Sequence, residues 1–375
     1  MQHGAGFRII GWLSRRPLRT VAAAVLAVTM AGTGSSFTAD PGPGGSARAR
    51  FLMGTRLTIE CRGEVNPRLF EEAFGAVARL EGILSNWIES SEVSRLNREG
   101  LRAPFRVSGD LLHAIEVSLA WAERTGGAFD PTVESLVRRY GLRAVDSFTG
   151  FRSEPDGEHE EAASEGPVSE PRPVVGWRDV DVDREGHSVR FRRDGIGIDL
   201  GGIGKGIALD EAVRILRAGG VAGGLLDFGG QVIAVGEAAP EDGWLIGVAD
   251  PERRDRAVAT VTLRRGSLAT SGNAERAVTV NQGSVGHILD PASGAPARFA
   301  GSVSVLAEDG TSADALSTAL FVMGPERGLG WAESRGIAAL YIRRTDGGEL
   351  QFMSTRALRP GIDWAPVEPT VRTGS

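Results

Sequence analysis

Residues 199–206, DLGGIGKG, join a predicted strand to a predicted helix and so decide how the chain changes direction at its centre. They also contain the only lysine of the chain. The sequence has 42 basic residues, so the other 41 are arginines. This bias suggests that Lys205 stands where a compact ammonium group on a flexible stem is required. Glycine occupies four of positions 201–206, and exposed backbone N–H groups beside a cation suit a phosphate. The alternative interpretation of this segment is a tight turn in which the lysine is present by chance.

The two familiar nucleotide-binding loops do not match this stretch. A Walker A loop requires glycine where Asp199 stands and serine or threonine where Gly206 stands. The dinucleotide fingerprint requires glycine at the position of Ile207. A phosphate bound here would therefore be bound by neither a P-loop nor a Rossmann turn.

Composition and charge exclude several classes of protein. The chain has 375 residues, of which 41% are hydrophobic, and a net charge of −6. This is enough apolar material for a large core, and the absence of a basic cluster beyond the N-terminus argues against nucleic acid as a partner. The single cysteine, Cys61, excludes an internal disulfide and a Cys-rich metal site, and we expect it to be packed inside a strand.

The first 49 residues resemble an export signal followed by a flexible segment. Four arginines precede an apolar run at 21–31, and a Gly/Ser/Pro-rich stretch follows at 32–47. The adjacent Arg15 and Arg16 fit a twin-arginine signal, and Sec export is the alternative. No cysteine follows the apolar run, so a lipoprotein anchor is not expected. We expect an extracytoplasmic protein in the periplasm or cell envelope, with tethering to the membrane by an uncleaved N-terminus as a further alternative.

The remaining pattern predicts one α+β domain over residues 50–358, with helices packed on a mixed, mostly antiparallel sheet. A flexible tail is expected at 359–375, and an acidic, disordered insertion at 144–173. Asn66-Pro67 begins one predicted helix, and Ser108 caps another that ends before Gly126. Further helices are expected at 207–217 and 313–323. Strands are expected at 51–60, 189–198, 225–235, 244–248, 257–263 and 302–307.

A second informative segment contains Asp314, Ser317 and Thr318. Their i, i+3 and i+4 spacing places three oxygen-bearing side chains on one helix face. Hard cations such as Mg²⁺ prefer oxygen ligands and commonly take one or two carboxylates together with substrate phosphates. The alternative is a carboxylate that complements a helix dipole, beside hydroxyls bonded to backbone carbonyls.

Seven segments, in order, resemble the ApbE family of Mg²⁺-dependent FAD:protein FMN transferases. They are 53–55 (MGT), 84–87 (LSNW) leading to 91–97 (SEVSRLN), 127–133 (GAFDPTV), 199–206, 269–272 (ATSG), 287–291 (HILDP) with Gly294, and 313–319 (ADALSTA). The resemblance implies a single compact α+β domain that is T-fold-like. It also implies transfer of the FMN half of FAD, the substrate, to a Ser or Thr hydroxyl of a partner protein, with release of AMP.

The resemblance also implies roles for individual residues. The positions that match FAD contacts are Met53, Trp87, Ala128, Phe129, Asp130, Asp199, Lys205 and Ile288. For Mg²⁺, the implied ligands are the Gly202 carbonyl, Asp314 and Thr318, and Ser317 is a weaker candidate because some members carry aspartate there. Lys205 is also expected to act in catalysis. His287 is a hypothetical general base, and a structural role across the Asp290-Pro291 turn is its alternative.

Two other functions use the same residues. With water as the acceptor, the chain would be an FAD pyrophosphatase that produces FMN and AMP. With an idle metal site, it would be a non-catalytic flavin-binding protein. For the transferase, the expected partner is an acceptor protein bearing a Ser/Thr flavinylation motif, and an extracytoplasmic redox protein at the membrane would be such a partner.

Overall fold

An eight-stranded antiparallel sheet forms the centre of the structure, a computed structural model that describes residues 45–142, 174–236, 243–272, 277–280, 283–359, 361 and 363–367. Its strand order is β1-β2-β6-β7-β10-β15-β16-β17. The bounds are β1 (Gly45–Leu52), β2 (Thr55–Arg62), β6 (Gly224–Phe228), β7 (Gln231–Val235), β10 (Ser267–Gly272), β15 (Ser302–Ala307), β16 (Ala338–Arg344) and β17 (Leu350–Ser354).

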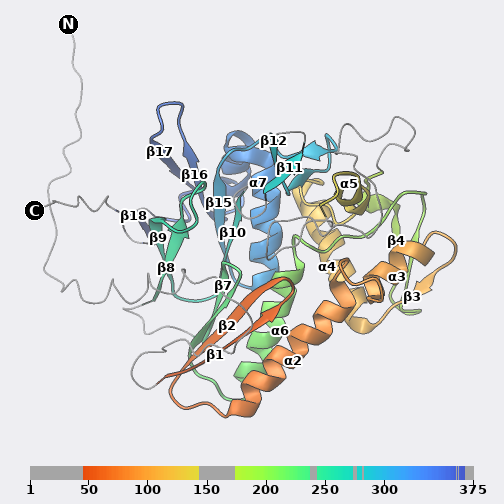
Figure 1. The fold of residues 1–375 in the computed structure, drawn as a ribbon, viewed down its shortest axis with the longest axis horizontal. Coiled ribbons are helices and arrows are strands. Elements are labelled where there is room, and N and C mark those ends of the chain that lie inside the picture. Colours follow the sequence, from red (N-terminus) through yellow and green to blue (C-terminus); the bar gives the residue numbers. More distant parts are fainter. Residues whose placement is uncertain are drawn as a thin grey trace, which may run out of the picture.

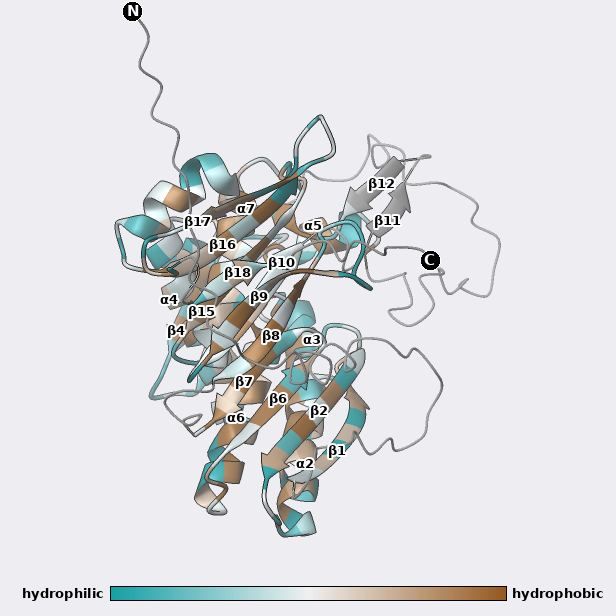
Figure 2. Cartoon of the chain, turned by 90° about the vertical axis from the view of Figure 1, so that its left-hand side faces the viewer, coloured by the Kyte–Doolittle hydropathy of each residue, from teal (hydrophilic) through white to brown (hydrophobic). Residues whose placement is uncertain are grey.

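Both faces of this sheet are covered, and strand β7 shows how. All five of its residues are buried, and successive side chains of a strand point to opposite faces. Ile233 and Val235 belong to the core beneath the helices. Val232 and Ala234 pack instead against a small sheet of β8 (Trp244–Ala249), β9 (Ala257–Leu263) and β18 (Trp364–Pro366), which lies in front of the large sheet in Figure 2.

Three helices cover the other face: α2 (Pro67–Leu84), α6 (Gly204–Ala218) and α7 (Gly310–Glu333). In Figure 1, α2 runs beside α6, and α7 lies above α6, where the first turns of the two helices meet. The smaller elements lie beyond them or between the sheets. They are α3 (Glu92–Glu99), α4 (Gly109–Thr125), α5 (Glu134–Arg139), the 3₁₀ helix η2 (Trp177–Asp179), β3 (Phe105–Arg106), β4 (Val180–Asp183), β5 (Ser188–Phe191), β11 (Ala277–Val280), β12 (Gly283–Gly286), β13 (Leu289–Asp290) and β14 (Ala295–Pro296).

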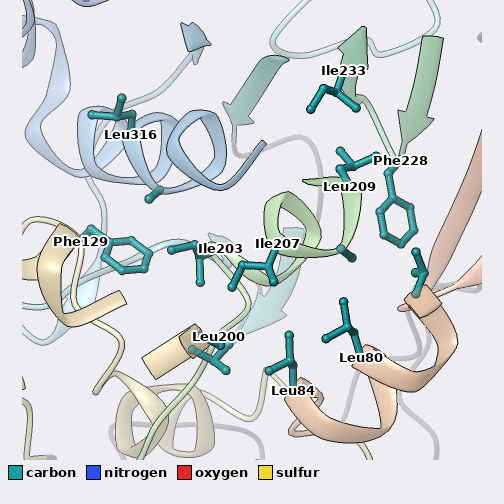
Figure 3. Packing of buried hydrophobic residues seen from close by; sticks show 14 of the residues in the cluster. Leu80, Leu84, Phe129, Leu200, Ile203, Ile207, Leu209, Phe228, Ile233 and Leu316 are labelled. Atoms are coloured by element: carbon teal, nitrogen blue, oxygen red, sulfur yellow. The ribbon is translucent and has the colours of Figure 1, made fainter. Parts of the chain in front are cut away.

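Helix α6 runs through the middle of the apolar core. Figure 3 shows Ile203 and Ile207, at the start of this helix, in one row with Phe129. Leu84 of α2 lies below the same row, and each of these four side chains is at most 7% exposed. The packing fixes the position of the glycine-rich turn that precedes α6.

Helices α6 and α7 meet at two glycines. A Cβ on Gly206 would lie 2.3 Å from the Gly310 carbonyl oxygen, and a Cβ on Gly310 would lie 2.7 Å from the Gly206 carbonyl oxygen. Each helix also supplies a carboxylate to the first turn of the other. Asp314 accepts the Gly206 N–H (3.0 Å), and Asp210 accepts the N–H groups of Gly310 (2.6 Å) and Thr311 (2.9 Å). These N–H groups have no partner within their own helix, so the two carboxylates act as reciprocal caps.

Several predicted elements are confirmed. Helix α2 begins after Asn66, whose side chain accepts the Arg68 N–H (3.0 Å). Ser108 caps α4, which ends at Gly126 in the left-handed conformation. Cys61 is buried as expected, and burial raises the pKa of its thiol to about 11.

Other predicted elements have different bounds. The strand expected at 51–60 is a hairpin, because Met53 and Gly54 both have positive φ and reverse the chain between β1 and β2. The strand expected at 225–235 is likewise broken by Gly229 and Gly230, which turn β6 into β7. The strand expected at 189–198 ends at Phe191. Helix α6 begins at Gly204 rather than at residue 207, so Lys205 lies within its first turn.

The expected domain boundaries also change. Residues 45–49, expected to belong to the N-terminal segment, are part of β1 and pair with β2. The expected tail at 359–375 contributes strand β18, whose Trp364 is 8% exposed and pairs with Val261 of β9. The export signal falls, apart from its last few residues, outside the described residues, and so does the acidic insertion at 144–173. No helix in the described part is long and apolar enough to cross a membrane. The prediction of a single compact α+β domain is confirmed.

We expect Gly206→Ala to destabilise the protein by about 2–3 kcal/mol, because the new methyl group would clash with backbone atoms of α7 that cannot rotate away. Gly204→Ala is the matched control. It lies in the same helical turn with nothing within 4 Å of the new Cβ, and alanine favours a helix by about 1 kcal/mol over glycine. Urea unfolding of both variants measures the difference, and equal stabilities would contradict the proposed crossing.

Candidate active site

Most of the predicted site residues line one cavity of about 440 Å³. It lies against the first turn of α6, one face of α7, strand β10 and the hairpin that precedes β2. The predicted site residues that line it are Trp87, Ala128, Phe129, Asp130, Asp199, Gly202, Lys205, His287, Ile288, Asp314 and Thr318. Segments separated by more than two hundred residues in sequence therefore share one cavity.

Two predicted residues are not brought to the cavity wall. Met53 forms the corner of the β1–β2 hairpin, where its N–H donates to Glu81 (2.9 Å), and its neighbours Gly54 and Thr55 line the cavity instead. Ser317 is 1% exposed, donates to the Asp314 carbonyl oxygen (3.0 Å) and shares a hydrogen bond with Ser271 (2.9 Å). The Ser317 hydroxyl is therefore hydrogen-bonded to neighbouring protein groups and lies away from the cavity wall, and its role as a metal ligand stays a prediction.

Lys205 and Asp314 form the charged centre of the cavity. The Lys205 ammonium lies 3.9 Å from Asp314 Oδ1, while Asp314 Oδ2 accepts the Gly206 N–H (3.0 Å). Asp314 thus complements a helix N-terminus, as the alternative reading of the sequence suggested, but the helix is α6 rather than its own. Its other oxygen remains directed to the ammonium group. The positive end of α6 and Lys205 together give this wall an affinity for anions.

Hard oxygen donors gather beside this centre. Thr318 Oγ1 lies 3.5 Å from the Gly202 carbonyl oxygen, and Thr318 follows Asp314 by one helical turn. A Cβ on Gly202 would lie 3.1 Å from Thr318 Oγ1 and 3.3 Å from the Phe129 ring, so a larger residue would crowd the site. No group of three or more His, Cys, Asp or Glu side chains in the described part is arranged to hold a metal. A cation bound here would therefore depend on hydroxyl and carbonyl oxygens as well as on one carboxylate.

Asp199 and the residue before it are held by two asparagines, Asn86 and Asn97. Asn86 donates to Asp199 Oδ2 (3.0 Å), and the Gly201 N–H donates to Oδ1 (2.8 Å). Asn97 pairs with the backbone of Ile198 by donating to its carbonyl (2.8 Å) and accepting its N–H (2.7 Å). These contacts fix the entry to the glycine-rich turn, which explains why the LSNW and SRLN segments accompany it.

Asp130 lies in a buried part of the cavity wall. It is 7% exposed and accepts hydrogen bonds from the N–H (2.8 Å) and hydroxyl (2.6 Å) of Thr132. Burial raises its pKa above the ordinary value, and these hydrogen bonds act in the opposite direction. Its second oxygen accepts the Trp177 N–H (3.3 Å). Asp130 is therefore held as an acceptor with a fixed orientation.

Flat and apolar surfaces complete the cavity. Trp87 is 48% exposed at its edge, whereas Phe129 and Ile288 are buried. An exposed indole beside a cavity is suited to stack on a heteroaromatic ring. His287 precedes Ile288 on the same wall. The Asp290-Pro291 turn that follows is closed by the Ala292 N–H (3.0 Å) and the Ser293 hydroxyl (2.8 Å), both of which donate to the Asp290 carboxylate.

Two polar residues of the wall were not found from the sequence. Gln231 is 3% exposed, and its amide nitrogen donates to the Gly310 carbonyl (2.8 Å). Its amide oxygen has no hydrogen-bond partner among the described residues. Arg254 reaches the cavity from the loop between β8 and β9. The Gly229-Gly230 turn before Gln231 is the one sequence signal that could have pointed to the first of them.

Comparisons with known proteins agree with this arrangement. The ApbE family model matches residues 53–341. The chain is 32% identical over 348 residues to an FAD:protein FMN transferase of Treponema pallidum (strain Nichols), with 85% of this chain and 90% of that protein aligned.

Solved structures show the same fold. The ApbE protein of Thermotoga maritima MSB8 superposes with a TM-score of 0.69 at 30% identity, covering 86% of this chain and 97% of the other. The flavin transferase ApbE of Vibrio cholerae gives a TM-score of 0.68 at 25% identity, covering 84% and 97%. The family match runs from the hairpin before β2 into β16 and includes every segment that lines the cavity, so the chain belongs to the ApbE family.

Proposed function

We propose that this chain is a Mg²⁺-dependent FAD:protein FMN transferase. The observation that carries the proposal is the assembly, in one cavity, of a cation, a set of hard oxygen donors, an imidazole and an exposed indole. This combination suits a ligand that has both a pyrophosphate and flat rings. The Treponema pallidum relative is named an FAD:protein FMN transferase, and the Vibrio cholerae protein a flavin transferase, which supports transfer of a flavin.

The charged part and the aromatic, apolar part of the cavity wall suggest how FAD would lie. The pyrophosphate would face Lys205 and the first turn of α6, where a positive side chain and a helix N-terminus act together. A flavin or adenine ring would stack at Trp87, with Phe129 and Ile288 as the apolar surface nearby. Asp130 and Asp199 are held by protein donors and would accept hydrogen bonds from ring or sugar groups of the substrate.

The donor set fits Mg²⁺. The residues that would hold the ion are Gly202, through its carbonyl oxygen, together with Asp314 and Thr318. All three donors are oxygens and include only one carboxylate, which leaves positions for water and phosphate oxygens, as this ion prefers. When bound, the ion would supply Lewis-acid stabilisation of the charge that develops on the phosphate oxygens.

The transfer itself makes one P–O bond and breaks another. A Ser or Thr hydroxyl of the acceptor attacks the phosphorus on the FMN side of the pyrophosphate, and the bond from that phosphorus to the bridging oxygen breaks, so that AMP leaves. His287 takes the proton of the attacking hydroxyl. Lys205 stabilises the negative charge that builds up on the departing phosphate. The role of His287 would be excluded if His287→Gln retained full turnover.

The acceptor would be a protein outside the cytoplasm. The signal-like pattern of residues 1–49 supports this location, and a flavin-bearing redox protein at the membrane would be a suitable partner. The cavity is open at Trp87 and Arg254, both of which are exposed, so a protruding loop of a partner could reach it.

Incubation of the purified chain with FAD, Mg²⁺ and an acceptor that carries a Ser/Thr flavinylation motif tests the proposal. We expect covalently attached FMN on the acceptor, detected by intact mass, with one AMP released for each flavin attached. An acceptor with alanine in place of the modified residue is the control. Free FMN and AMP without attachment would establish an FAD pyrophosphatase instead, and FAD binding without turnover would establish a flavin-binding protein.

We expect Asp314→Asn to reduce turnover by about a hundredfold or more, because it removes the only carboxylate among the proposed metal ligands. Asparagine keeps the shape and one acceptor oxygen for the Gly206 N–H, so the helix crossing should survive. Asp210→Asn is the matched control at the same crossing. Because Asp210 accepts hydrogen bonds with both of its oxygens, asparagine there should lower the melting temperature, yet retain turnover under conditions where the protein is folded. Undiminished activity of Asp314→Asn would contradict the proposed metal site.

We expect Lys205→Arg to reduce turnover by about tenfold or more, since a planar guanidinium cannot replace a compact ammonium group beside Asp314. Arg217→Lys, an exposed exchange in the last turn of the same helix, controls for general effects of basic substitutions on α6. Steady-state AMP release measures both variants. Wild-type activity in Lys205→Arg would mean that any cation suffices at this position.

A further inference from the structure

Arg254 is a second cation at the cavity, and it comes from a part of the chain that none of the motifs includes. It lies in the loop formed by residues 250–256, which joins β8 to β9. Its Nη2 atom would lie 3.5 Å from a Cβ on Gly230. Because Gly230 has no side chain, the guanidinium group can lie over the β6–β7 turn and line the cavity.

The loop that carries Arg254 is firmly attached to the sheet. Asp250 is fully buried and forms an ion pair with Arg344 of β16. Glu252 pairs with the same arginine (2.9 Å), and the Asp250 N–H donates to the Arg256 carbonyl (2.8 Å). These contacts use the acidic side chains at the start of the loop, whereas Arg253 and Arg254 are exposed.

Arg254 forms no direct ion pair with a carboxylate of the described residues. Asp227, whose carboxylate accepts the Gly230 N–H (2.9 Å), is an acidic group that interacts with it electrostatically. Burial raises the pKa of Asp227, and Arg254 is one of the groups that act against this rise. An unpaired cation beside a cavity favours an anionic ligand.

Short contacts connect Arg254 to the proposed phosphate site. Gly230, beneath the guanidinium, is followed by Gln231, whose amide donates to the Gly310 carbonyl (2.8 Å). Gly310 in turn contacts Gly206, the neighbour of Lys205. The two cations therefore flank one continuous polar wall. Gln231 itself is buried, so the polar groups that face the cavity along this wall are the two cations.

We propose that Arg254 is a substrate-binding residue that contacts a phosphate of FAD and so acts together with Lys205 on the pyrophosphate. This inference rests on the proposed function, since it assumes that FAD occupies the cavity. A guanidinium group presents several donors in a fixed fork that matches phosphate oxygens. The pyrophosphate carries two negative charges, so a second cation relieves the repulsion from the carboxylates of Asp130 and Asp199 in the same cavity.

Equilibrium binding to Arg254→Gln tests the inference. We expect the dissociation constants of FAD and of ADP to rise about tenfold, because a charged hydrogen bond to phosphate is lost. Binding of riboflavin, which has no phosphate, should stay unchanged. Arg253→Gln is the matched control, because it removes the neighbouring exposed arginine of the same loop, which does not line the cavity. Its FAD affinity should equal that of the wild type.

Two outcomes would overturn the inference. Arg253→Gln could lose as much affinity as Arg254→Gln, which would indicate a general field effect. Alternatively, Arg254→Gln could bind FAD as tightly as the wild type, and a raised KM for the acceptor in that variant would then assign Arg254 to acceptor recognition. These failures are distinguishable from failure of the proposed function, in which the wild-type chain itself would neither bind FAD nor release AMP.

Discussion

The close crossing of α6 and α7 is the contact on which the rest of the site depends. Gly206 and Gly310 allow the two backbones to touch, and Asp210 and Asp314 each satisfy donors in the first turn of the opposite helix. Because the caps are reciprocal, neither helix can shift without leaving buried N–H groups unpaired, which costs about 1–3 kcal/mol for each group. The crossing thus sets the relative position of the two helices.

This constraint also positions the chemistry. Asp314 uses one oxygen to cap α6 and presents the other to Lys205, so a single carboxylate links the fold to the cavity. Thr318, one helical turn later, then lies beside the Gly202 carbonyl. The same wall extends through Gln231 to the β6–β7 turn. Groups from three distant segments are therefore held by contacts that also stabilise the core.

The electrostatic balance of the cavity suits an anionic substrate with flat rings. Three carboxylates line it, yet each has an assigned partner: Thr132 for Asp130, Asn86 for Asp199, and the Gly206 N–H for Asp314. The cations Lys205 and Arg254 are less completely paired. The exposed Trp87 adds a stacking surface at the edge. The acidic groups thus orient the wall, while the basic groups remain available to a ligand.

By itself, the sequence determined the class of fold, the helix start sites at Asn66 and Ser108, and most of the cavity residues. These depend on local signals, namely capping side chains, apolar periodicity and short motifs that stand close together in the chain. Only the tertiary structure decided that Ser317 turns to Ser271, that Asp314 caps α6, and that Arg254 reaches the cavity. Each of these depends on which distant backbone a side chain meets, and spacing along one chain carries no information about a contact between two helices or between a loop and a turn.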